Sequence, residues 1–371
     1  MERKEKLLVY PYDIEFAPVI RHAELMKGYE IAGVCSPSGW GLAGRDAGEA
    51  VYAENTGIIV KSNFEEMLES CDTVLFSESK EKLDFDKYIY SRMLKSIDAG
   101  KNLLCAIEMD KAVADQIGEL CKSKGVYFKH FNREAPLDTP YEGDMNRIHS
   151  INTPVIFVIG IAGFTGKFEI QLSLREKFLK EGYRVSQIGS RNYCQLFGFH
   201  SFPHFMNCTI PEVEKVYRFN AFVKQIEERE NPDVIIIGVP GAVMPYNNDF
   251  TNGFGITAYE ISNALTPDAV VMSLYYADYV EEYFTLTSTS MRYKLGLEVD
   301  CYSISNVAFD NKSDFRRNPD HIILKSSLIN DKKKFTGLSI PVFNILNRSD
   351  ADKMGDHIIN KLGSYAERCI L

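Results

Sequence analysis

The chain contains no long hydrophobic run. Its longest apolar stretches, around residues 155–163 and 269–272, are much shorter than the ~20 residues that a membrane-spanning helix needs. The N-terminal residues also lack the extended apolar region of a secretory signal. We therefore expect a cytoplasmic protein without a membrane partner.

Closely spaced cysteines are also missing, since the eight cysteines are scattered along the chain. Metal sites and disulfide frameworks use close or regular cysteine spacing, so we predict reduced thiols and no metal site. The formal net charge of −9 shows no excess of positive charge, which argues against nucleic acid as a partner. A chain of 371 residues that is 45% hydrophobic is long enough for two globular domains.

Short apolar strands alternate with helices over residues 1–150. Strands are predicted at residues 7–10, 30–35, 58–60, 73–76, 103–107 and 126–130, and helices at 17–27, 64–70, 86–99 and 111–124. This alternation indicates βαβ units and a mostly parallel sheet, hence a Rossmann-like α/β domain. The first turn, YPYDIEFAP, lacks the G-x-G-x-x-G that a dinucleotide pyrophosphate needs, so we do not expect NAD there.

Ligands of parallel sheets bind beyond the carboxyl ends of the strands. The residues predicted at these ends are Tyr12, Asp13, Ser36, Ser77, Glu78, Glu108 and Asn132. The glycine-rich loop at residues 36–48 holds the only tryptophan, Trp40. This loop either folds over a ligand, with Trp40 as a lid, or is a surface loop whose Trp40 packs against the second domain. The polar, proline-bearing residues 133–154 are predicted to link the domains.

The stretch VIFVIGIAGFTGKFEIQLSL, residues 155–174, is typical of a phosphate-binding loop. An apolar strand leads to Gly160, Gly163, Gly166 and Lys167, and a helix follows. Gly160 and Gly166 are six positions apart rather than five, which resembles the P-loop branch that includes dethiobiotin synthetase and the nitrogenase iron protein. We predict that backbone N–H groups and Lys167 bind the phosphates of ATP or GTP.

Two departures from the P-loop pattern make magnesium binding doubtful. Phe168 stands where a serine or threonine hydroxyl would bind Mg²⁺. The second phosphate-site strand and its turn, VIIIGVPG, run to Gly241. Ile237 or Gly238 takes the place of the usual carboxylate, and Asp233 lies at the start of the strand. Phosphoryl transfer depends on that metal, so ordinary ATP hydrolysis is not expected. We predict a P-loop-like α/β domain over residues 151–371, with Phe168 buried beneath the loop.

Further polar and aromatic residues of this half leave alternatives open. Arg191 and Asn192 follow the second strand of the domain, where nucleotide-switch residues lie in P-loop proteins, but they equally suit a helix cap. The region around residues 259–283 is rich in tyrosine, and we expect most of these side chains to be core or interface residues.

Three segments together carry a family resemblance. KLLVYPYDIEFAPVIRH, CSPSGWGLAGRDAG and IGIAGFTGKFEIQ resemble the uncharacterised bacterial "peptide maturation system" family, which is encoded beside ribosomally made precursor peptides such as bacteriocins. The resemblance covers nearly the whole chain. It implies a role in peptide maturation by association, with a precursor peptide or the maturation enzymes as partners.

The leading hypothesis is an accessory protein of natural-product biosynthesis that binds a nucleotide or phosphorylated ligand. One alternative is an ATP-dependent ligase or kinase that acts on a carboxylate and holds Mg²⁺ with carboxylates from elsewhere in the chain. Another is a non-catalytic scaffold that binds precursor peptide or maturation enzymes. The sequence assigns no catalytic residue, and it leaves open whether the protein is an enzyme and whether it forms a homo-oligomer.

Overall fold

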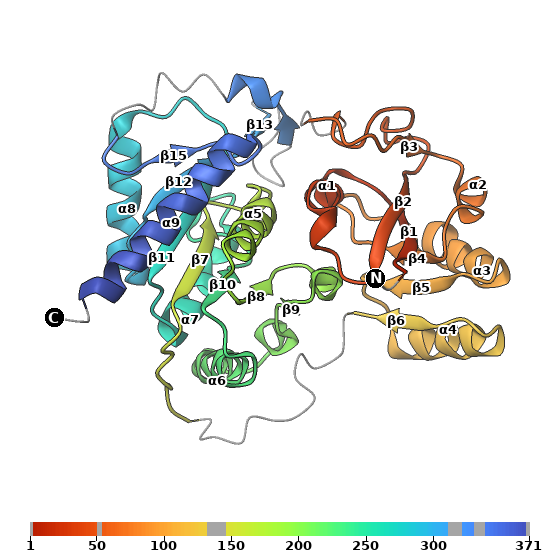
Figure 1. The fold of residues 1–371 in the computed structure, drawn as a ribbon, viewed down its shortest axis with the longest axis horizontal. Helices are drawn as coiled ribbons and strands as arrows, with labels where there is room; N and C mark the ends of the chain where they lie inside the picture. The colour runs from red at the N-terminus through yellow and green to blue at the C-terminus, as the bar shows by residue number, and fades with distance from the viewer. Residues whose placement is uncertain (1–2, 50–53, 132–145, 311–320, 330–337, 369–371) are drawn as a thin grey trace. The chain divides into compact units, whose positions relative to one another are not determined.

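The chain is divided into two compact units, each with its own sheet (Figure 1). The computed structural model describes residues 3–49, 54–131, 146–310, 321–329 and 338–368. One unit comprises Met1–Asp138 together with Arg191–Ser201, and the other comprises Thr139–Ser190 with Phe202–Leu371. Asn132 and most of the predicted linker lie outside the described residues. The domain ranges 1–150 and 151–371 therefore stay a prediction.

The first unit contains a six-stranded sheet in the order β3-β2-β1-β4-β5-β6, and every pairing in it is parallel. Its strands are β1 (Glu5–Tyr10), β2 (Tyr29–Cys35), β3 (Val60–Lys61), β4 (Thr73–Phe76), β5 (Asn102–Cys105) and β6 (Phe128–His130). This order is that of the doubly wound Rossmann fold, in which ligands bind where the strand order reverses. The predicted fold class of this half is confirmed.

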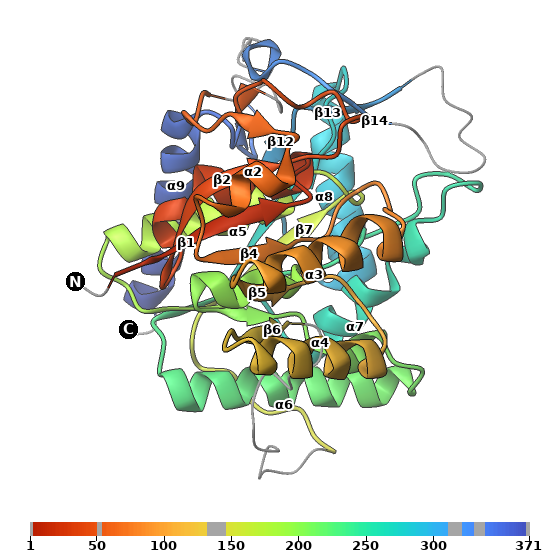
Figure 2. The ribbon, with the colours of Figure 1, turned by 90° about the vertical axis from the view of Figure 1, so that its right-hand side faces the viewer.

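Helices of the first unit cover one face of this sheet, and Figure 2 shows α2, α3 and α4 in front of the strands. The helical elements are η1 (Ile14–Phe16), α1 (Ala17–Arg21), η2 (Ala23–Leu25), α2 (Phe64–Leu68), η4 (Phe85–Tyr90), α3 (Ser91–Asp98) and α4 (Lys111–Ser123). Apolar side chains of α2, η4, α3 and α4, among them Phe64, Met93 and Ile117, form one core with Leu8 and Val74. The helix predicted at residues 17–27 is shorter than expected, because His22 leaves the helical region with φ −114°.

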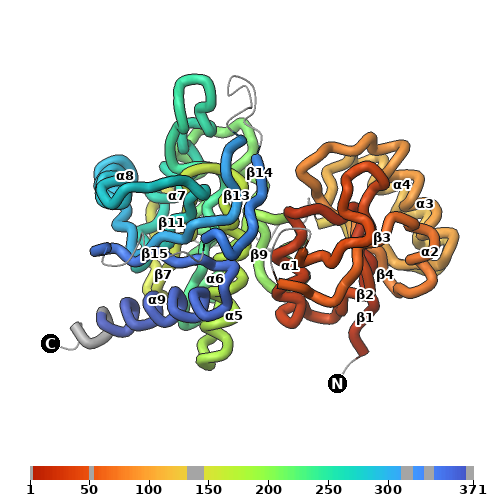
Figure 3. The backbone as a smooth tube through the Cα atoms, turned by 90° about the horizontal axis from the view of Figure 1, so that it is seen from above, coloured from red at the N-terminus to blue at the C-terminus, as the bar shows by residue number. Residues whose placement is uncertain are grey.

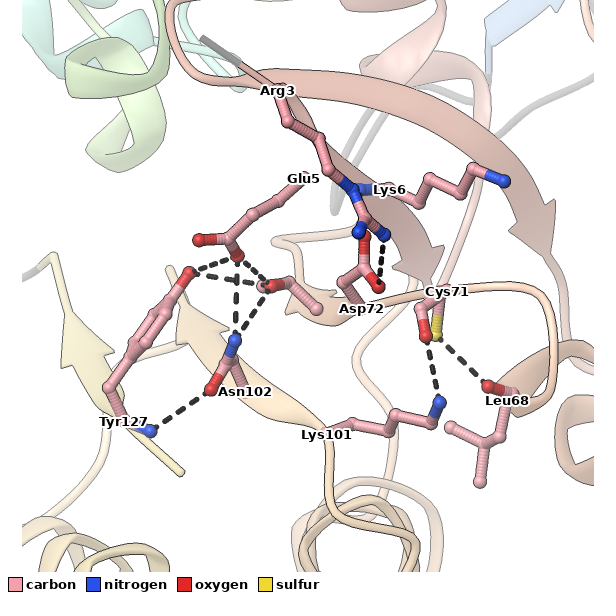
Figure 4. A network of polar contacts seen from close by, with 10 residues as sticks. Arg3, Glu5, Lys6, Leu68, Cys71, Asp72, Lys101, Asn102 and Tyr127 are labelled. Carbon is pink, nitrogen blue, oxygen red and sulfur yellow. Dashed lines mark hydrogen bonds and ion pairs between the residues drawn. The ribbon is translucent and has the colours of Figure 1, made fainter. Parts of the chain in front are cut away.

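A polar network joins the amino ends of three strands of the first sheet (Figure 4). The Glu5 carboxylate accepts hydrogen bonds from the hydroxyls of Thr73 and Tyr127, the latter at 2.7 Å. Asn102 Nδ2 donates to the same carboxylate at 3.5 Å, and Asn102 Oδ1 accepts from the Tyr127 backbone N–H at 3.1 Å. These bonds use the polar groups at this end of the sheet to connect β1, β4 and β5.

The second unit also has a parallel sheet, six of whose strands follow the order β15-β12-β11-β7-β10-β8. They are β7 (Val155–Gly160), β8 (Val185–Gly189), β10 (Val234–Gly238), β11 (Ala269–Leu274), β12 (Cys301–Ile304) and β15 (Val342–Phe343). The chain runs from β7 out to β8, returns to β10, and crosses to β11 on the other side of β7. The carboxyl end of β7 is therefore the topological switch point, where such sheets bind ligands.

Two of the later strands do not join this sheet. β13 (Val307–Phe309) and β14 (His321–Ile323) pair with each other as a separate antiparallel ribbon. Their short, half-exposed segments have no continuous apolar run that would favour a buried parallel strand.

Helices lie on both faces of the second sheet, and Figure 3 shows α9 on one side of the strands and α7 and α8 on the other. The helical elements are α5 (Lys167–Lys180), η6 (His204–Asn207), α6 (Glu212–Glu230), η7 (Asn252–Gly255), α7 (Ile256–Ala264), α8 (Glu281–Leu295), η8 (Ser326–Leu328) and α9 (Arg348–Arg368). Ile170 and Leu174 of α5 and Met354 of α9 share a core with Val158 and Ile236 of the sheet. Of the helices that the structure describes, none is long and apolar enough to cross a membrane.

Candidate functional site

The predicted phosphate loop lies between β7 and α5, at the switch point of the second sheet. Gly166 precedes the helix with φ +79°, a left-handed conformation that favours glycine. A Cβ at Gly160 would lie only 2.8 Å from Thr165 Oγ1 and 3.0 Å from Lys167 Cδ. The loop therefore needs glycine at these two positions, for conformation at Gly166 and for space at Gly160. Gly163 has neither constraint.

Side-chain donors hold the carbonyl groups of this loop. The Tyr275 hydroxyl donates to Gly163 O at 2.6 Å, and the Ser273 hydroxyl donates to Thr165 O. Thr165 Oγ1 donates to Ala162 O at 3.3 Å. With the carbonyls fixed in this way, the peptide planes of the loop are oriented before any ligand arrives.

The backbone N–H groups of the same loop are available to an anion. Within the part of the chain that the structure describes, none of the N–H groups of residues 162–166 has a hydrogen-bond acceptor. Successive N–H groups in a loop of this kind, followed by a helix N-terminus, form a concave site for negative charge. The loop has the shape of a phosphate cradle.

Lys167 reaches the rim of this cradle from the first turn of α5. The residue is 8% exposed. Its Nζ donates to Ala162 O at 3.0 Å and also to Gly241 O, in the turn after β10. Two backbone carbonyls thus position the ammonium group between the loop and this turn, where its charge would meet a bound phosphate.

Phe168 follows on α5 and is 4% exposed, so the predicted burial of this side chain is confirmed. Its ring offers no oxygen to a cation. A serine or threonine at this position would present a hydroxyl to a magnesium ion that bridges the phosphates. The packing that Phe168 provides replaces that metal contact.

Gln171 occupies the space that a side chain at Gly238 would need. A Cβ at Gly238 would lie 2.1 Å from Gln171 Nε2 and 2.3 Å from its Oε1. Gln171 is fully buried, and its Nε2 donates to Lys167 O at 3.2 Å. The neutral amide of Gln171 therefore fills the space that a side chain at Gly238 would occupy.

A second buried glutamine faces the same helix. Gln187 on β8 is paired with Ile236, whose side chain lies in the core under α5. Neither amide atom of Gln187, nor Gln171 Oε1, has a hydrogen-bond partner among the described residues. Both amides are neutral, and Asp233 at the start of β10 forms an exposed ion pair with Arg184 at 2.7 Å. Phe168 and Gly238 thus offer no side-chain oxygen to a magnesium ion, and Gln171 offers only a neutral amide oxygen.

The carboxyl edge of the first sheet is built differently, because the segment Arg191–Ser201 packs there. This segment contains η5 (Asn192–Phe197) and β9 (His200–Ser201). Arg191 forms an ion pair with Glu15, and Asn192 Nδ2 donates to Glu78 at 2.7 Å and to Ala106 O at 3.2 Å. Arg191 is the N-cap residue of η5 but makes no side-chain capping bond. Arg191 thus occupies the helix-cap position that the sequence suggested, while its side chain pairs with Glu15.

Two buried carboxyl groups lie at this edge. Burial raises the pKa of Asp13 to about 6, and it raises the pKa of Glu78 to about 7 against the opposing charge of Arg191. Asp13 also accepts hydrogen bonds from the N–H groups of Glu15 and Lys80. Both carboxyl groups therefore have hydrogen-bond partners within the chain itself.

Other residues predicted at this edge also have structural contacts. The Ser77 hydroxyl donates to Pro11 O at 2.6 Å, and the Tyr12 hydroxyl donates to Ala47 O at 2.7 Å. Ser36 is fully buried, and its hydroxyl has no partner among the described residues. Trp40 is half-buried in its loop. Its role as a lid over a ligand and its role as a packing residue of a surface loop both stay predictions.

The sequence therefore predicted the position of the loop but not all of the side chains that surround it. Gln171 was visible in the helix after Lys167, three positions beyond Phe168, and that spacing places it on the same helix face. The side-chain donors Ser273 and Tyr275 come from β11 and the residue after it. No spacing in the sequence links them to the loop, since more than a hundred residues intervene.

Comparison with known proteins gives a fold and no family. No family model and no curated protein matches the chain. The chain is similar to a DUF1611 family protein from Anabaena variabilis ATCC 29413, with a TM-score of 0.62 and 13% identity over 96% of this chain and 100% of the other. At this identity the similarity shows the fold alone.

Two further solved structures overlap only part of the chain. A putative plasmid partition protein from Borrelia burgdorferi B31, bound to AMPPNP, has a TM-score of 0.33 and 13% identity, over 58% of this chain and all of the other. Cobyrinic acid a,c-diamide synthase from Mycobacterium smegmatis, with ADP and magnesium, has a TM-score of 0.33 and 12% identity, over 57% of this chain and 96% of the other. Neither contributes to the assignment of the site.

Proposed function

We propose that the second unit binds a nucleotide or another phosphorylated ligand at residues 160–167 without a magnesium ion held by protein side chains. The observation that carries this proposal is the loop whose carbonyls are fixed by side-chain donors while the N–H groups of residues 162–166 have no acceptor among the described residues. Lys167 adds a positive charge at the rim. Charge-assisted hydrogen bonds contribute roughly 1.5–3 kcal/mol each, so this set supports binding without metal.

Equilibrium titration of ATP and GTP, in Mg²⁺ and in EDTA, tests this proposal. We expect similar dissociation constants in both buffers. Lys167→Ala should weaken binding about ten-fold or more, since ~1.4 kcal/mol is a factor of ten. Lys180→Ala is the matched control, because Lys180 lies near the other end of the same helix, where it forms an ion pair with Glu176.

Thermal unfolding of both variants shows whether a loss of affinity reflects a loss of fold. Binding to folded Lys167→Ala as tight as to the wild type would overturn the proposal. So would Mg²⁺-dependent ATP turnover that Lys167→Ala abolishes, because it would make the protein an ATP-using enzyme such as a carboxylate ligase or kinase.

The biological role that we propose is accessory to the maturation of a ribosomally made peptide. It rests on the resemblance of the two loop motifs and the first strand to the peptide maturation system family. A synthetic precursor peptide encoded beside the gene should bind the full chain, with an affinity that changes when ATP is present. Absence of binding in both conditions would remove the peptide role and leave the phosphate site in place.

A further inference from the structure

Six aromatic side chains lie beside the phosphate loop, and we call them the aromatic cluster. Its members come from the loop, from the residues after β10 and β11, and from the ribbon of β13 and β14: Phe164, Tyr246, Phe250, Tyr275, Phe309 and His321. Ring centroids are 4.4 Å apart for Tyr275 and Phe309, 4.6 Å for Tyr246 and Phe309, and 5.4 Å for Phe164 and His321. The Tyr275 hydroxyl, which holds Gly163 O, also lies 3.0 Å from His321 Nε2. The cluster is thus connected directly to the cradle.

Phe164 has a backbone conformation that is unfavourable for phenylalanine. Its φ is +55°, in the left-handed region where a Cβ crowds the following carbonyl group. Its neighbour Gly163, which would adopt this conformation freely, does not have a positive φ. The Phe164 side chain is also 45% exposed, so burial compensates little. Strained residues are concentrated at ligand sites, and Phe164 lies within the phosphate loop itself.

We propose that the aromatic cluster stacks on a planar ring belonging to the ligand whose phosphate occupies the loop. The ligand would then be a nucleoside phosphate, and neither a sugar phosphate nor an inorganic polyphosphate. This inference rests on the proposed function and names its ligand class. Phe164 and Tyr246, which is 46% exposed, supply the accessible rings. Aromatic side chains bind nucleobases by stacking with little dependence on base identity, so ATP, GTP and CTP should bind about equally.

Phe164→Gly is the informative variant, because it removes the ring and relieves the strained backbone together. The wild type should bind ATP roughly ten-fold tighter than inorganic tripolyphosphate, as expected for one stacked base. Phe164→Gly should lose this preference, keep its affinity for tripolyphosphate, and melt at the same or a higher temperature than the wild type. Phe164→Tyr should restore the preference for ATP.

Phe254→Gly is the matched control. Phe254 also has a positive φ, +57°, and is 58% exposed, but it is not a member of the aromatic cluster. It should gain stability without any change in the ratio of ATP to tripolyphosphate affinity. Tyr246→Ala provides a second test of the cluster, and it should lower ATP affinity alone.

The outcomes separate this inference from the proposed function. Suppose that Lys167→Ala binds ATP more weakly than the wild type, but Phe164→Gly and Tyr246→Ala bind it equally well. The stacking site is then refuted, and the phosphate site stands. If the wild type binds tripolyphosphate as tightly as ATP, the ligand class is refuted. If it binds neither compound, both proposals fail.

Discussion

Gln171 and Phe168 show how single residues change the chemistry of a phosphate loop. The amide of Gln171 fills the space beside Gly238, and the Phe168 ring is buried one helical turn earlier. A carboxylate and a hydroxyl at these places would supply the charged and polar oxygens that hold Mg²⁺, whereas the Gln171 amide carries no charge and the phenyl ring has no oxygen. The loop geometry is independent of both side chains, which is why cation binding can be lost while the anion site is kept.

Restoring one hydroxyl should not restore hydrolysis. Phe168→Thr would place an oxygen at the usual position, but Gly238 still lacks a carboxylate and Gln171 still fills its space. We expect no Mg²⁺-dependent phosphate release from ATP. We also expect a loss of roughly 2–4 kcal/mol in the free energy of unfolding, because a buried ring is replaced by a smaller polar side chain.

Phe168→Leu is the control for packing in that experiment, since it keeps an apolar side chain. Chemical denaturation measures the stability of both variants, and an assay for released phosphate measures turnover. Steady Mg²⁺-dependent turnover by Phe168→Thr would contradict our account of the metal position.

Glu78 gives the first unit a pH-dependent stability. Burial raises its pKa from the ordinary value of 4.5 to about 7, so the folded state binds the proton more tightly than the unfolded state. The contribution of Glu78 to stability is thus fully present below about pH 4.5 and is lost as the pH rises through 7. Glu78→Gln keeps an acceptor for Asn192 and cannot ionise. Relative to the wild type, this variant should gain stability progressively between pH 4.5 and 8, by about 1 kcal/mol or more.

Urea denaturation at several pH values checks this expectation. The informative quantity is the difference in unfolding free energy between variant and wild type, because the titration of Asp13 is common to both and cancels. Glu81→Gln, an exposed change in the following loop, is the control and should show no such trend. A difference for Glu78→Gln that does not vary with pH would disprove the role of burial.

At the scale of elements, the phosphate loop depends on β11 as much as on β7 and α5. Tyr275→Phe removes the hydroxyl that donates to Gly163 O but keeps the ring in the aromatic cluster. A loop with one carbonyl released is less well oriented, so phosphate binding should weaken about three- to ten-fold, the effect of one hydrogen bond. Tripolyphosphate titration measures this loss without a contribution from base stacking.

Tyr279→Phe is the control for that change, since its hydroxyl donates to the Tyr275 backbone carbonyl at 2.9 Å and does not contact the loop. Equal affinities in the two variants would show that the Gly163 bond is not needed for the site.

The elements that the sequence predicted well are those whose local pattern agrees with their packing. β4 (Thr73–Phe76) has the predicted bounds, and α5 (Lys167–Lys180) follows the phosphate loop as predicted. The helix expected at residues 17–27 is divided, because its apolar pattern continues past the point where the backbone turns at His22. The spacing of apolar residues indicates which side chains are buried. It does not indicate where the backbone must bend to pack against neighbouring elements.

At the scale of the whole molecule, strand alternation was enough to predict two parallel α/β folds, because crossover connections constrain the topology. The partners of the loop were not predictable in the same way. Tyr275 and Phe309 reach the site through the order of strands and through the ribbon of β13 and β14, and both depend on long-range pairing. The packing of the segment Arg191–Ser201 was not predicted either. Nothing in its sequence indicates that it belongs to the same unit as Met1–Asp138.

That segment has a consequence for the order in which the protein can be made. The first unit is not one continuous stretch, because Arg191–Ser201 supplies Glu15 with its ion-pair partner and Glu78 with its amide donor. On the ribosome, Met1–Asp138 emerges long before these residues are synthesised, and the buried carboxyl groups must wait for them. A gene cut between the two halves would therefore yield an N-terminal product that lacks part of its own interior.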